Sequence, residues 1–180
     1  VGEDERERFD LSLVLAGCVD GYRVAYPTHS LQLELPPGEA ILNGAPELIA
    51  QMLDKLVANA VEFSAPEMPI VVRLERGDTE LILSVANEGP PLPDAMHGRL
   101  FDSMVSVRGD QRGGSPADPN TDTRSDQEGN RHKGGPHLGL GLYIVRLIAE
   151  AHRGRASARN RDDGLGVVVA DLTGDGWTDI

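Results

Sequence analysis

Near the C-terminal end of the chain, residues 134–145 read Gly-Gly-Pro-His-Leu-Gly-Leu-Gly-Leu-Tyr-Ile-Val, a glycine-rich stretch that runs directly into an apolar helical pattern. Glycine lets backbone N–H groups come close to an anion, and the first turn of a helix points unpaired N–H donors toward the same place. The stretch is therefore typical of a phosphate-binding loop. Tight packing of a turn before a buried helix would explain the same glycines, so the stretch alone leaves both interpretations open.

A second informative stretch lies upstream, where the pattern predicts an amphipathic helix from Pro46 to about Ser64. Along one edge of its apolar face, helical spacing places four residues in a single strip: Lys55, Asn59, Glu62 and Phe63. The carboxamide oxygen of Asn59 suits Mg²⁺, an ion that is usually held by few protein oxygens together with the phosphates of its ligand. Alternatively, Asn59 only borders the core and bonds to the backbone.

The bulk composition narrows the class of protein. The 180 residues, 39% of them hydrophobic, suffice for one domain with a core but not for two ordinary ones. A net charge of −12 argues against a partner that is duplex nucleic acid, because phosphate neutralisation needs clustered Lys and Arg. The single cysteine, Cys18, excludes an internal disulfide or a thiolate metal site, fits a reducing compartment, and is expected to be buried.

No stretch approaches the roughly 20 apolar residues of a membrane span, so we expect no direct membrane contact by this segment. The charged start, residues 1–8, is unlike a signal peptide and resembles the tail of a preceding helix, which predicts that the chain is part of a longer protein.

The remaining elements follow from periodicity and turn signals. We expect a helix capped by Asp10 and ending at about Tyr26, strands at 31–35, 69–75, 80–86, 155–159 and 166–172, and a last helix over 139–152. Residues 110–136 lack almost every apolar side chain, so they cannot repay the entropy of ordering. A structureless segment of this length inside one domain predicts a mobile lid, since the chain beyond it is too short for a second domain.

Taken in order, several of these segments resemble the N, G1, F and G2 sequence boxes of sensor histidine kinases. They are the Asn59 helix, the residues Asn87-Glu88-Gly89-Pro90-Pro91, the Leu100-Phe101-Asp102 segment, the polar lid, and Gly139-Leu140-Gly141-Leu142. The resemblance spans nearly the whole chain and points to the catalytic, ATP-binding domain of that family. It implies the Bergerat fold shared with gyrase B, Hsp90 and MutL: an α/β two-layer sandwich, with a mixed, mostly antiparallel sheet covered on one face by helices, and a long mobile lid over ATP.

Site roles are carried over from the family by position. The resemblance implies that Asn59 holds Mg²⁺ and is the catalytic residue, that Phe63 and Asn87 meet the adenine, and that Gly89 lets the backbone approach the base. It implies that Phe101 anchors the near end of the lid, although a plain hydrophobic plug is the alternative. The other predicted nucleotide contacts are Lys133, Gly135, His137, Leu138, Gly139, Leu140, Gly141 and Leu142.

This chain departs from the family pattern at the G1 box, where Asn87 replaces an aspartate and Pro91 replaces a glycine. The Asn87 oxygen can still accept from the adenine amino group, and its NH₂ can donate to the neighbouring ring nitrogen. In the N box, Glu62 stands where a lysine is common, and it would repel a triphosphate unless its carboxylate turns to solvent or toward a lid cation. Four lid cations are candidates for the missing positive charge, the alternative being that they are simply solvated: Arg108, Arg112, Arg131 and Lys133.

Lys55 is the third departure, because relatives that hydrolyse ATP carry a water-activating glutamate there. A protonated lysine is a poor general base, so the pocket suits transfer of the γ-phosphoryl group to another nucleophile. The resemblance implies a histidine on a dimerisation and phosphotransfer domain of the same parent protein, with a response-regulator receiver domain downstream. The alternatives are a degenerate nucleotide-sensing or protein-docking module, and a water-using ATPase.

The domain boundaries follow from these assignments. We expect an upstream helix end or linker at residues 1–10, the kinase-like ATPase domain at 11–174 with its lid at about 102–137, and a tail at 175–180. The resemblance implies a cytoplasmic location, with a parent protein anchored in the bacterial inner membrane as one arrangement. A Rossmann domain is excluded because its glycine motif follows a strand and opens a βαβ unit.

Overall fold

The computed structural model describes residues 6–96, 99–102, 140–162 and 166–169. The described helices are α1 (Leu11–Ala25), α2 (Pro46–Phe63) and α3 (Gly141–Ala151), with a short 3₁₀ helix, η2 (Asp94–Met96). The described strands are β1 (Glu7–Asp10), β2 (Ser30–Glu34), β3 (Ile41–Gly44), β4 (Pro69–Arg76), β5 (Leu81–Glu88), β6 (Ala158–Asn160) and β7 (Gly166–Val169).

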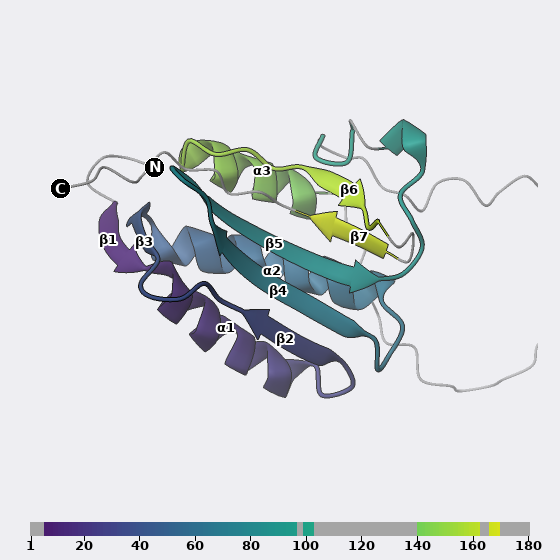
Figure 1. Cartoon of the computed structure of the whole chain (residues 1–180). Coiled ribbons are helices and arrows are strands. Elements are labelled where there is room, and N and C mark those ends of the chain that lie inside the picture. Colours follow the sequence, from purple (N-terminus) through teal and green to yellow (C-terminus); the bar gives the residue numbers. More distant parts are fainter. Residues whose placement is uncertain (1–5, 97–98, 103–139, 163–165, 170–180) are drawn as a thin grey trace, which may run out of the picture.

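The main sheet has the strand order β2-β4-β5-β7-β6, and the helices lie on one of its faces (Figure 1). Strand β2 is parallel to β4, whereas the other neighbouring pairs are antiparallel. Strands β1 and β3 form a separate antiparallel pair. The predicted two-layer α/β fold, with a mixed and mostly antiparallel sheet, is confirmed.

The core lies between the sheet and the helices. Alternate residues of β4 and β5 are buried, as expected for strands with one covered face: Ile70, Val72, Leu74, Leu81, Leu83, Val85 and Asn87. Helix α2 contributes the opposing apolar face, which includes Ile49, Met52, Leu53, Leu56 and Val57. The row along β5 ends on the polar residue Asn87, which is only 4% exposed.

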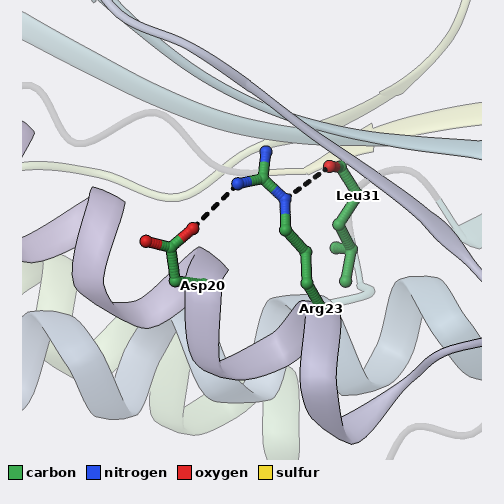
Figure 2. Close-up of polar contacts among 3 residues, drawn as sticks. All are labelled: Asp20, Arg23 and Leu31. Carbon is green, nitrogen blue, oxygen red and sulfur yellow. Dashed lines mark hydrogen bonds and ion pairs between the residues drawn. The ribbon is translucent and has the colours of Figure 1, made fainter.

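Helix α1 begins as the sequence predicted, because the side chain of Asp10 accepts a hydrogen bond from the backbone N–H of Ser12 at 3.0 Å. The other end of α1 is tied to the sheet by Arg23. Figure 2 shows that the Arg23 guanidinium donates both to the Leu31 carbonyl oxygen of β2 and to Asp20 one turn earlier. The position of α1 is therefore fixed at both ends.

Residues 7–10 correct the prediction, because they form strand β1 rather than the end of a helix. Strand β3, with which β1 pairs, was not predicted. Both strands are four residues long, and the tie between them depends on distant groups: Asp10 also accepts from the N–H of Ala40, and Leu11 donates to the Ala40 carbonyl. A pairing of this kind leaves no periodic signal in so short a stretch.

The C-terminal elements are shorter than predicted. Helix α3 is assigned from Gly141, two residues later than expected, and β6 is confined to Ala158–Asn160. For β7, the predicted residues 170–172 lie outside the described part of the chain. Cys18 is partly buried beside the core rather than fully buried.

Candidate functional site

Helices α2 and α3 lie side by side and run in opposite directions (Figure 1). Their direction is fixed at one end, where the ring of His152, at the C-cap of α3, accepts a hydrogen bond from the N–H of Ala45, the N-cap of α2. The 11 residues of α3 span about 17 Å at 1.5 Å per residue. The start of α3 therefore lies roughly level with residues 56–59 of α2, which brings Gly141 and Asn59 to the same end of the helix pair.

Asn59 is partly buried on α2. Within the described residues its carboxamide forms no hydrogen bond, so the alternative in which it bonds to the backbone is not observed. One turn earlier, Lys55 pairs with the neighbouring Asp54 at 3.4 Å, and both side chains are substantially exposed. Glu62 is exposed. The amide oxygen of Asn59 is thus available to a metal or a ligand.

Asn87 occupies the last inward-facing position of β5, opposite Val167 of β7. Its carboxamide forms no hydrogen bond within the described part of the chain, although the residue is only 4% exposed. The Asn87 oxygen and nitrogen are not among the fully buried side-chain atoms that lack a partner in the described residues, so both keep some access from outside the fold.

The C-terminal end of α2 packs directly against the loop that follows β5. A Cβ atom added to Gly89 would lie 2.2 Å from the carbonyl oxygen of Phe63 and 3.3 Å from the Nδ2 atom of Asn87. Packing against Phe63 therefore accounts for a glycine at this position, without any ligand. Beside Phe63, the hydroxyl of Ser64 is buried and has no hydrogen-bond partner among the described residues.

The start of α3 differs from Gly89, because a Cβ atom added to Gly141 would meet nothing within 4 Å. Packing against the described residues therefore does not require a glycine here. The N-cap residue, Leu140, forms no side-chain capping bond and is 37% exposed. The first turn of α3 therefore has no side-chain acceptor at its cap, as an anion-binding helix start would require.

Sequence reasoning missed the side chains that hold the loop after Gly89. The carboxamide of Asn160 on β6 accepts from the N–H of Leu92 at 2.7 Å and donates to the Leu92 carbonyl at 3.1 Å. Next to it, Arg161 forms a partly buried ion pair with Glu88 at 3.8 Å. No motif in the sequence signals these contacts, because they join residues about 70 positions apart.

Phe101 and Leu100 are 8% and 5% exposed and belong to the core. The adjacent Asp102 pairs with Arg146 of α3 at 3.3 Å, and the Arg146 guanidinium lies over the ring of Tyr143. These contacts agree with both interpretations of Phe101, the lid anchor and the hydrophobic plug. Either way, they fix the chain at the point where its described part ends.

At the opposite end of the helix pair, where α2 begins and α3 ends, both ring nitrogens of His152 have protein partners. The Nδ1 atom of His152 donates to the Ile148 carbonyl at 2.8 Å while Nε2 accepts from Ala45 at 3.1 Å, an arrangement that needs the neutral imidazole. Burial lowers the pKa of His152 from its ordinary value, and the nearby Arg6 acts in the same direction. A Cβ atom on Gly44 would lie 2.5 Å from this ring.

Several predicted site residues lie outside the described part of the chain: Lys133, Gly135, His137, Leu138, Gly139 and the lid cations Arg108, Arg112 and Arg131. Leu142 is described and packs against the core from the first turn of α3.

In the described residues, no group of three or more His, Cys, Asp or Glu side chains could hold a metal ion. None of the described helices is both long and apolar enough to cross a membrane.

Comparison with known proteins identifies a family and several relatives that this chain resembles. A family model described as histidine kinase-, DNA gyrase B-, and HSP90-like ATPase matches residues 44–173. The probable sensor histidine kinase TcrY of Mycobacterium tuberculosis is 30% identical over 173 residues, covering 96% of this chain and 32% of the relative. A bacteriophytochrome of Pseudomonas aeruginosa is 31% identical over 155 residues, covering 86% of this chain and 18% of the relative. The chain thus spans a third or less of the length of these relatives.

Solved structures show the same fold. The catalytic domain of the histidine kinase ThkA superposes with a TM-score of 0.71 at 22% identity, over 93% of both chains. ThkA in complex with the response regulator protein TrrA matches with a TM-score of 0.68 at 20% identity, over 93% of this chain and 41% of that chain. Full-length ShkA in complex with AMPPNP matches with a TM-score of 0.67 at 17% identity, over 94% of this chain and 31% of that chain.

Proposed function

Because the chain belongs to the histidine kinase-, DNA gyrase B-, and HSP90-like ATPase family, we propose that it is the ATP-binding catalytic domain of a two-component sensor histidine kinase. It binds Mg·ATP and presents the γ-phosphoryl group to a histidine on a dimerisation and phosphotransfer domain of its parent protein. From that histidine, the phosphoryl group passes to the aspartate of a response-regulator receiver domain.

One observation carries the proposal: two carboxamides without protein partners, Asn59 and Asn87, lie at the end of the helix pair where α3 begins with the unobstructed Gly141. In the proposed complex, the purine lies near Phe63 and Asn87, and the phosphates lie at the start of α3. The N-terminal N–H groups and dipole of α3 stabilise the negative charge.

The metal is supported by the donor chemistry of the described residues. Asn59 supplies one neutral oxygen, and Mg²⁺ commonly binds through one or two protein oxygens plus substrate phosphates and water. Mg²⁺ would neutralise charge on the phosphates and orient them. Lys55 next to this oxygen is paired with Asp54 and exposed, so it is not placed as a general base for water.

The proposed partners are inferred from relatives of this chain. TcrY is a probable sensor histidine kinase, and ThkA forms a complex with a response regulator protein. We extend both features to the parent of this chain, together with a cytoplasmic location for this domain. The five histidines of the chain include none in a His-Glu-x-x-x-Pro setting, so the phosphoacceptor is expected on another segment.

Isothermal titration with ATP and ADP, in the presence and absence of Mg²⁺, tests the binding step. We expect saturable binding that Mg²⁺ strengthens and that Asn59→Ala weakens strongly. Transfer is then tested by adding the phosphoacceptor domain of the parent protein with labelled ATP, where label on a histidine is the expected result. Steady phosphate release by the isolated chain would instead indicate a water-using ATPase.

A second candidate is a nucleotide-sensing or protein-docking module that transfers nothing. The replacement of the G1 aspartate by Asn87 and of the second glycine by Pro91 favours it. In that case, ATP binding is weak or absent, and the phosphoacceptor domain stays unlabelled.

A further inference from the structure

Asn87, which the proposed function places against the purine base, has a neutral carboxamide that no hydrogen bond to the described residues orients. Asn87 is 4% exposed, and within the described residues neither its oxygen nor its NH₂ group forms a hydrogen bond, although neither atom is among those fully shut off from solvent. The Nδ2 atom lies against Gly89, next to the end of α2. A carboxamide in this state can turn over without breaking a hydrogen bond to the described residues.

A neighbouring asparagine shows the opposite case. The carboxamide of Asn160 accepts from the Leu92 N–H and donates to the Leu92 carbonyl, so turning it over would replace two hydrogen bonds with two repulsive contacts. Both residues flank the same loop, and only one of them is oriented by the protein.

Turning the carboxamide exchanges its donor and its acceptor. With the oxygen toward the exocyclic position, it accepts from the 6-amino group of adenine while the NH₂ donates to N1. Turned over, its NH₂ donates to a 6-oxo group while the oxygen accepts from N1–H, which is the edge that hypoxanthine and guanine present. A carboxylate at this position accepts only, and cannot complete both pairs with either base.

We propose that Asn87 makes the site a purine nucleotide site that accepts 6-oxo as well as 6-amino bases. The inference rests on the proposed function, because it names the class of nucleotide that the same pocket takes. In the proposed complex, the phosphates of both classes meet the start of α3 in the same way, so the proposal assigns discrimination between the bases to the Asn87 carboxamide.

Inosine triphosphate is the sharpest probe, because it differs from ATP in the 6-oxo edge and lacks the 2-amino group of GTP. Titration of the unmodified chain should give dissociation constants for Mg·ATP and Mg·ITP within about threefold, since each base forms the same number of hydrogen bonds. The isosteric Asn87→Leu variant should weaken both nucleotides by about 10- to 100-fold, the loss expected for two hydrogen bonds.

The control makes the same change at the exposed Asn43 of β3, and Asn43→Leu should leave both affinities unchanged. Asn87→Leu removes an unpaired polar group from a buried position, so the melting temperature of the unliganded chain should not fall. If this variant fails to fold, Asn87→Ala replaces it with the same expected loss for both nucleotides.

Three outcomes are distinguishable. ITP binding more than about 30-fold weaker than ATP, or a loss in Asn87→Leu that affects ATP alone, overturns the inference and leaves the proposed function intact. Affinities that do not change in Asn87→Leu also overturn it, because the base is then held by stacking rather than by the carboxamide. Failure of the unmodified chain to bind either nucleotide overturns the proposed function, and the inference falls with it.

Discussion

The two ends of helix α2 differ in whether the polar groups around them have hydrogen-bond partners. At its N-terminal end, His152 uses both ring nitrogens to join α2 to the end of α3, and Gly44 leaves the space that the ring fills. At its C-terminal half, Asn59 and Ser64 keep polar groups without partners in the described structure, and Asn87 of β5 does the same. The difference teaches that polar groups at one end hold the fold together, whereas those at the other end are available for the ligand that we propose.

The largest expected effect on ATP affinity comes from Asn59→Ala, which removes the side-chain amide oxygen proposed to bind Mg²⁺. We expect Mg-dependent ATP affinity to fall by about 100-fold, or about 2.7 kcal/mol, as for loss of a metal-orienting group. The melting temperature of the unliganded domain should stay nearly constant, because no protein group loses a partner. Isothermal titration and thermal unfolding measure the two quantities, and a large drop in unliganded stability would return Asn59 to a structural role.

At the N-terminal end of α2, Gly44→Ala should lower stability rather than ATP affinity. Its Cβ would lie 2.5 Å from the His152 ring, so the ring or β3 must move, at a cost of about 1–3 kcal/mol in unfolding free energy. ATP affinity of the folded protein should change little. Urea unfolding measures the cost, and Gly17→Ala on α1, where a Cβ meets nothing within 4 Å, is the control without a clash.

Gly141→Ala tests the other end of the helix pair from the side of α3. The new Cβ meets no atom of the described residues within 4 Å, so the unliganded domain should gain about 0.4–1 kcal/mol from the reduced freedom of its unfolded chain. ATP affinity should fall at the same time, because the methyl group occupies space that the phosphates approach. If affinity and stability rise together, the phosphates do not lie at the start of α3.

The pH dependence of stability should also come from the N-terminal end of α2. The pKa of His152 is lowered in the folded state, so below the unfolded value of about 6.5 the unfolded chain binds the extra proton first. The contribution of His152 is therefore complete above that value and is lost as the pH falls toward the folded pKa. Denaturant titrations between pH 8 and 5 measure this slope.

His152→Gln is the matched variant for the pH experiment. Glutamine can accept from Ala45 and donate to the Ile148 carbonyl, but it does not titrate. We expect the variant to be less stable at pH 8 and to lose the component of the slope due to His152. An identical slope in the variant would assign the pH dependence to other groups.

Much of the fold could be predicted from local patterns. A short stretch of sequence predicts each of three features: the Asp10 cap, the apolar face of α2 and the alternation of β4 and β5. This is possible because a single helix or strand repeats its environment every few residues. The pairing of β1 with β3 could not be predicted, since it depends on contacts with Ala40 and not on periodicity.

The same division runs through the candidate site. The sequence by itself determined which chemical groups are present, including Asn59, Asn87 and the glycine at position 141, because motif spacing is a property of the chain. Only the tertiary structure decided that Gly89 serves the packing of Phe63, that Asn160 holds Leu92, and that His152 closes one end of α2. The reason is physical: whether a polar group is paired or free depends on partners that folding brings from distant parts of the chain.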